Sequence, residues 1–82
     1  MNEIWDVIGT KFSKWQDKQS GEWKEGTRLY LSRLPNDYES VEGYITDSVF
    51  VSPDKCDSYP SIDDQVTLVY DRYGKFKYVQ VV

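Results

Sequence analysis

The stretch that decides the fold class is residues 27–33, which read Thr27-Arg28-Leu29-Tyr30-Leu31-Ser32-Arg33. Leu29 and Leu31 alternate with polar or amphipathic side chains. Because successive side chains of a β-strand point to opposite faces, this alternation predicts a strand that buries one face. The strand should end at Pro35, since proline has no backbone N–H to donate to a β-ladder.

The composition extends this prediction to the whole chain of 82 residues. Val, Ile, Thr, Tyr, Phe and Trp together number 30, and the chain contains no alanine. β-branched and aromatic residues suit a pleated, half-buried surface better than a helix. A chain of this length can hold one small core. We therefore expect a single all-β domain over residues 1–82.

Further β-rich runs cover residues 4–12, 41–51, 64–70 and 75–82. In the first run Ile4, Ile8 and Phe12 share one parity, and in the run 64–70 we expect Val66, Leu68 and Tyr70 to point inward. Two glycines stand out within these runs. Gly9 predicts a bulge or a close backbone approach, and Gly43 predicts a bulge.

The connections between these runs contain turn residues. The polar segment 17–22 predicts a long exposed hairpin whose tip carries Lys18, Trp23 and Lys24. The sequence Ser52-Pro53 predicts one helical turn, with serine as the cap and proline at the first position. The glycine at the end of residues 71–74 supplies the positive φ of a second tight turn. Five antiparallel strands with one short helical turn predict a small closed barrel, which leaves no strand edge exposed.

The chain has a single cysteine, Cys56, and no histidine, which limits the kinds of functional site that it can form. A disulfide within the chain, the usual zinc sites and histidine acid–base catalysis are excluded. We therefore expect no enzyme, no metal and no cofactor, with Cys56 as a partly buried spacer in a loop. No apolar run reaches the roughly 20 residues that span a bilayer, so a cytoplasmic protein without membrane contact is expected.

The net charge of −4 is unevenly distributed. Residues 1–33 carry six Lys/Arg and five Asp/Glu, residues 34–71 carry one and nine, and residues 72–82 carry three and none. The three segments have net charges of +1, −8 and +3, so an acidic segment lies between two basic ends. If the two ends meet in space, they form a positive face and leave a negative one elsewhere.

Four segments of the sequence resemble a known family. They are Gly9 with Lys11, Phe12 and Trp15; residues 26–32; residues 49–52; and the closing run Asp63 to Lys75. The order of these segments resembles small single-stranded-DNA-binding proteins of Gram-positive phages and conjugative elements, similar in layout to the gene V protein of filamentous phages. Asp63-Asp64 stands where the resemblance leads us to expect Gly-Asp.

The resemblance implies an OB-like barrel that binds single-stranded DNA without sequence preference for a phage or mobile element. Such sites combine cations that follow the phosphates with aromatic rings on which bases stack. Trp15 is expected in the core rather than on the binding surface. The candidate nucleic-acid-binding residues are Lys11, Lys14, Trp23, Lys24, Arg28, Tyr30, Arg72, Tyr73, Lys75 and Lys77.

An alternative is a protein-binding role for the acidic segment 37–64. Its carboxylates could meet a basic partner, so that the protein acts as a phage-type inhibitor of a host nucleic-acid-binding protein. The residues 78–82 form a β-prone apolar end that must pair either inside the barrel or with a second chain. A homodimer is therefore a further prediction, which the gene V resemblance also implies.

Overall fold

The computed structural model describes residues 3–82, and they form an all-β fold with one short helical turn. All strand pairs are antiparallel, as the sequence predicts. The elements are β1 (Ile4–Gln16), β2 (Trp23–Arg33), β3 (Ile45–Val51), the 3-10 turn η1 (Pro53–Lys55), β4 (Gln65–Tyr70) and β5 (Phe76–Val81).

The five strands form one sheet in the order β3-β2-β1-β4-β5. β3 and β5 are its two edges and do not pair, so the sheet is not closed and the expected closed barrel is not confirmed. β5 instead contacts the segment that follows β3. The Tyr78 hydroxyl of β5 donates to Asp57 Oδ1 at 2.6 Å, and Lys55 Nζ of η1 lies 5.4 Å from the centre of the Phe76 ring.

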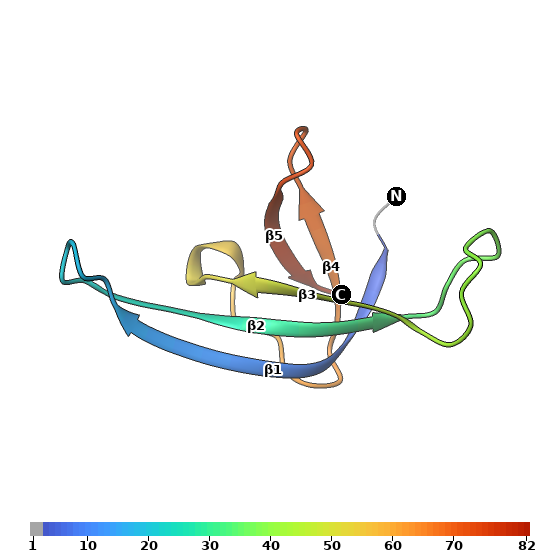
Figure 1. The fold of residues 1–82 in the computed structure, drawn as a ribbon, viewed down its shortest axis with the longest axis horizontal. Coiled ribbons are helices and arrows are strands. Elements are labelled where there is room, and N and C mark those ends of the chain that lie inside the picture. Colours follow the sequence, from blue (N-terminus) through green and yellow to red (C-terminus); the bar gives the residue numbers. More distant parts are fainter. Residues whose placement is uncertain (1–2) are drawn as a thin grey trace.

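A bulge in β1 lies where this strand changes from pairing with both β2 and β4 to pairing with β2 alone. Val7 pairs with Leu31 and Gly9 pairs with Tyr30, which leaves Ile8 as the extra residue. Such a bulge bends its strand and increases the local twist. Before the bulge β1 pairs with β4, and after it β1 pairs with β2 alone. The β4–β5 hairpin therefore rises from the layer of β1, β2 and β3 (Figure 1).

The core lies between this layer and the β4–β5 hairpin. Leu29 and Leu31 are fully buried there, as the alternation in residues 27–33 predicts. The buried hydrophobic residues are Trp5, Val7, Leu29, Leu31, Val51, Val66, Leu68 and Val79.

The expectation that Ile4, Ile8 and Phe12 share one face is wrong. Ile8 is the extra residue of the bulge, which reverses the parity of the rest of β1, so Phe12 lies opposite Thr27 on the core side of the sheet and contacts Tyr59. Tyr70 is expected to point inward but is 51% exposed, because the register of β4 against β5 shifts between Val69 and Tyr70. The inward placement of Val66 and Leu68 is confirmed.

Two backbone positions explain where strands begin. Gly43 has a φ of +87° and ends a loop rather than forming a bulge, so β3 begins at Ile45 and not at Val41. Asp63 has a φ of +75°, in the left-handed region that favours glycine. Aspartate is one of the few residues other than glycine that tolerate this conformation.

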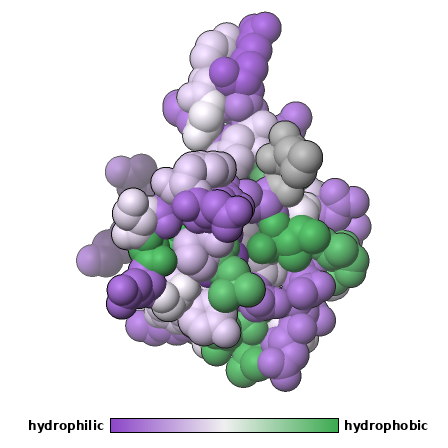
Figure 2. Space-filling model, turned by 90° about the vertical axis from the view of Figure 1, so that its right-hand side faces the viewer, coloured by the Kyte–Doolittle hydropathy of each residue, from purple (hydrophilic) through white to green (hydrophobic). Residues whose placement is uncertain are grey.

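The molecule is elongated, with extents of 49 × 28 × 22 Å. The β1–β2 hairpin projects at one end and the β2–β3 loop at the other (Figure 1). Figure 2 looks at the loop end, where the β4–β5 hairpin stands out at the top as a narrow, mainly hydrophilic arm. Within residues 3–82, no helix has the length and apolar character that crossing a membrane requires.

Candidate functional site

The surface of β1, β2 and β3 that points away from β4 and β5 gathers several of the candidate residues. We call it the outer face. Residues directly opposite each other in an antiparallel pair lie on the same side of the sheet, so the register defines its members. After the β1 bulge they are Gly9, Lys11, Ser13 and Trp15 of β1, Lys24, Gly26, Arg28 and Tyr30 of β2, and Ser48 and Phe50 of β3. Before the bulge the same face continues through Asp6, Ser32 and Thr46.

Two glycines of the outer face lie directly beneath aromatic rings. A Cβ atom on Gly26 would lie 2.3 Å from Phe50 Cζ and 2.9 Å from the carbonyl oxygen of Val51, so only glycine leaves room for this ring. A Cβ atom on Gly9 would lie 3.4 Å from Cδ2 of Tyr30, which is an ordinary van der Waals contact. Of the two expectations for Gly9, the bulge is confirmed, because the extra residue Ile8 directly precedes it. Both rings rest on the sheet rather than standing away from it.

Arg28 lies between these two rings on β2. Its guanidinium carbon is 5.9 Å from the centre of the Phe50 ring, and its Nη1 donates to Ser48 Oγ at 3.3 Å. On the neighbouring strand β1, Lys11 lies directly opposite Arg28. No ion pair within residues 3–82 involves Lys11 or Arg28. Two cations thus stand side by side without a carboxylate partner.

The outer face continues toward the β1–β2 hairpin through Trp15 and Lys24, which are paired. Trp15 is 42% exposed, and its ring centre lies 5.9 Å from that of Phe50. The expectation that Trp15 belongs to the core is therefore wrong. Its partner Lys24 is 3.0 Å from Asp17 Oδ2. The pKa of Asp17 is lowered, chiefly by the Gln19 backbone N–H and next by Lys24.

The outer face carries no acidic side chain in its central part. The part after the β1 bulge holds three cations and three aromatic rings. Carboxylates lie at its border: Asp6 is on the same face before the bulge, opposite Ser32, and Asp47 lines a hollow beside Tyr30. Sequence reasoning did not select Phe50 as a site residue. The signal that could have found it is Gly26, because a glycine within a β-run marks the close approach of another group.

Lys14 and Trp23 do not join this face. Both have the opposite parity in β1 and β2 and lie on the side that faces the core. They contact each other there, with Lys14 Nζ 5.7 Å from the centre of the Trp23 ring. Trp23 nevertheless remains 64% exposed because it lies at the start of β2, beyond the end of β3.

The basic residues of the β4–β5 hairpin form a separate group. Since β4 and β5 pack on the core side of the sheet, their hairpin lies across the core from the outer face. At its tip, Arg72 lies 5.1 Å from the centre of the Tyr73 ring, and Tyr73 is 75% exposed. Lys75 and Lys77 are also exposed. The structure does not bring these four residues together with Arg28 and Tyr30.

Several carboxylates of the acidic segment 37–64 make local contacts. The Asp64 side chain accepts a hydrogen bond from the Ser61 backbone N–H at 2.8 Å, and Asp57 accepts the one from Tyr78. Asp54 bonds to the Ser52 side chain. Cys56, the predicted spacer, is partly buried, and this burial raises the pKa of its thiol.

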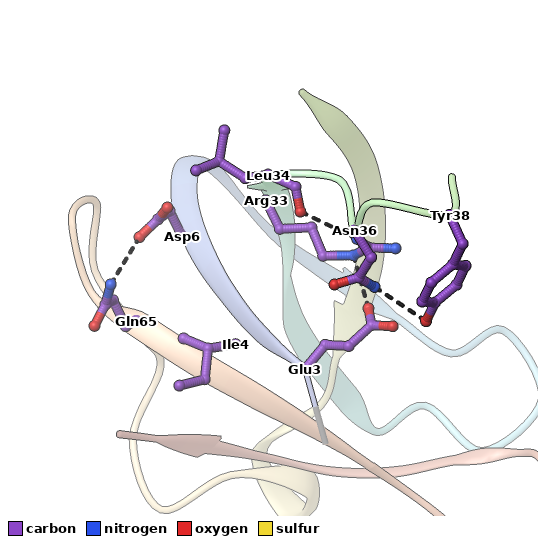
Figure 3. A pocket seen from close by; sticks show the side chains of 8 residues that line it. All are labelled: Glu3, Ile4, Asp6, Arg33, Leu34, Asn36, Tyr38 and Gln65. Carbon is purple, nitrogen blue, oxygen red and sulfur yellow. Dashed lines mark hydrogen bonds and ion pairs between the residues drawn. The ribbon is translucent and has the colours of Figure 1, made fainter. Parts of the chain in front are cut away.

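A polar pocket of about 590 Å³ lies at the opposite end of β2 (Figure 3). Arg33 forms two ion pairs in this pocket, with Nε 2.7 Å from Glu3 Oε2 and Nη1 2.8 Å from Glu39 Oε1. Its guanidinium carbon also lies 5.1 Å from the centre of the Trp5 ring. The Arg33 guanidinium, and next the Asn36 backbone N–H, lower the pKa of Glu39 to about 2. These contacts fasten the start of the β2–β3 loop to the sheet.

The pKa of Glu39 predicts how Glu39→Gln changes the dependence of stability on pH. A carboxyl group whose pKa is lower in the folded protein stabilises it above the ordinary pKa of 4.5 and loses this effect as the pH falls toward about 2. Glu39→Gln should therefore be less stable than wild type at pH 7, and the difference should shrink below pH 4.5. Urea unfolding at several pH values measures the difference in stability between wild type and Glu39→Gln. A difference that does not change with pH would contradict the lowered pKa of Glu39.

The fold and the outer face define an all-β protein whose open sheet carries cations and aromatic rings on one surface. Comparisons with protein-family models, with curated proteins and with solved structures found no match. The resemblance noted in the sequence therefore remains a prediction.

Proposed function

We propose that the protein binds single-stranded DNA without sequence preference through the outer face. The observation that carries the proposal is the alternation of rings and cations, with Phe50, Arg28 and Tyr30 in a row and Lys11 beside them. Cations follow the phosphates of a single strand, and each base that stacks on an aromatic ring contributes about 1–3 kcal/mol. Stacking tolerates any sequence because every base has a π-face.

We base the proposed OB-like fold on the open, five-stranded antiparallel sheet. The OB fold is a partly open five-stranded barrel that binds oligonucleotides on a strand face and on the loops that join strands 1–2 and 4–5. The open sheet here has five strands, and the β1–β2 loop lies at the end of the outer face. The β4–β5 loop lies across the core from this face and is not part of the proposed surface. We therefore include the OB-like fold in the proposal. The origin in a phage or mobile element and the homodimer stay predictions from the sequence.

The exposed position of Tyr30 provides the test. Tyr30→Ala removes a stacking ring but no charge, so we expect affinity for a labelled oligo-dT to fall about 5- to 150-fold. The dependence of log K on log salt should keep its slope, because the number of phosphate contacts is unchanged. Fluorescence anisotropy at several salt concentrations measures both quantities.

Tyr38→Ala is the matched control, since Tyr38 is 85% exposed in the β2–β3 loop, away from the outer face. Its affinity should equal that of wild type. Equal losses in the two variants would show that the ring of Tyr30 has no special role. Absence of wild-type binding even at low salt would overturn the proposed function, and the acidic segment 37–64 would become the surface to test for a basic protein partner.

A further inference from the structure

A second aromatic site adjoins the outer face at the free edge of β2. Residues 23–26 of β2 pair with β1 but have no partner on their other side, because β3 ends opposite Thr27. A cavity of about 340 Å³ lies there, between the β1–β2 hairpin and η1. It is lined by Trp15, Trp23, Lys24, Glu25, Phe50, Ser52 and Pro53.

The lining identifies the chemistry that this cavity can accept. Three aromatic rings border it, and Trp15 and Trp23 are 42% and 64% exposed, so a planar ring system stacked on them would remove their surface from water. The volume lies at the lower end of the range for small-molecule sites, which favours one ring system over a longer segment. Lys24 supplies a cation at the rim and is half exposed despite its contact with Asp17.

The cavity is continuous with the outer face, because Trp15, Lys24 and Phe50 belong to both. A DNA single strand that crosses the outer face along β2 reaches the cavity as it passes Phe50. We propose that the cavity receives one unstacked nucleobase of this bound strand, with Trp23 as the wall that belongs to the cavity alone. This inference rests on the proposed function and adds a distinct subsite to it.

Trp23→Ala tests the inference in combination with an abasic scan. A set of short oligo-dT strands is prepared, each with one abasic nucleotide at a different position, and anisotropy gives their affinities for the full-length protein. Wild type should lose affinity about 5- to 150-fold where the missing base is the one in the cavity. Trp23→Ala should bind the intact strand correspondingly more weakly and should be insensitive to the abasic nucleotide at that position, because the two changes remove the same contact.

Two variants complete the experiment. Trp23→Phe keeps an aromatic wall and should keep the wild-type abasic profile, and Tyr38→Ala should match wild type throughout. If wild type binds but Trp23→Ala shows the same affinity and abasic profile, the cavity inference is wrong while the proposed function stands. If wild type does not bind oligo-dT at low salt, the proposed function fails and the cavity inference fails with it.

Discussion

Replacing Lys11 and Arg28 together by glutamate is expected to lower the affinity for single-stranded DNA by at least about 100-fold at moderate salt. These two cations lie opposite each other on the outer face and have no carboxylate partner within residues 3–82. Each substitution changes the charge by −2, so the net charge moves from −4 to −8. Like charges brought together at an interface cost several kcal/mol, and about 2.7 kcal/mol corresponds to 100-fold.

The salt dependence distinguishes lost phosphate contacts from a general change in charge. Loss of two contacts should reduce the slope of log K against log salt by about 1.4, at about 0.7 per contact with a single strand. The matched control is Arg72→Glu with Lys75→Glu, which changes the charge equally on the β4–β5 hairpin. We expect a smaller loss there, because that hairpin lies across the core from the outer face. A loss as large in the hairpin variant would move the binding surface to the hairpin.

Leu29→Ala is expected to produce the largest loss of stability. Leu29 is 0% exposed and packs in the core that joins β2 to β4 and β5. Shortening such a side chain typically costs about 2–5 kcal/mol, through lost burial and the cavity left behind. Small domains are stable by only about 5–15 kcal/mol, so this variant should unfold at a much lower urea concentration.

Leu34→Ala is the matched control for this experiment, because it makes the same chemical change at a residue that is 70% exposed. Its effect should stay within about 0.5 kcal/mol. Urea titrations followed by circular dichroism compare the two variants at equal m-values. Equal costs for Leu29→Ala and Leu34→Ala would contradict the assignment of the core.

The sequence predicts the strands more reliably than the faces that they present. Alternation identifies residues 27–33 as a strand, and Ser52-Pro53 correctly predicts one helical turn. The facing of residues 9–16 depends on the bulge at Ile8, which reverses the parity of everything that follows. A one-residue slip moves every side chain to the other face, so the sequence puts Lys11 and Lys14 on different sides but does not tell which of the two lies on the outer face.

Closure of the sheet and the composition of the site depend on contacts between distant segments. β5 is joined to the loop after η1 by the hydrogen bond of Tyr78 with Asp57, two side chains 21 residues apart, which no local pattern predicts. The role of Phe50 depends on its register against Arg28 and on the space above Gly26. Local patterns therefore give the strands, whereas the pairing register decides which cations and rings share a surface.

The most direct test of the central claim is to map amide chemical-shift changes in the protein by nuclear magnetic resonance while short oligo-dT is added at low salt. We expect the largest changes to cluster in residues 9–15, 24–30 and 48–50 and on the indole N–H of Trp15, and we expect added salt to reverse them. Changes confined to residues 36–44 and 54–64, or no changes at all, would contradict binding of a single strand to the outer face.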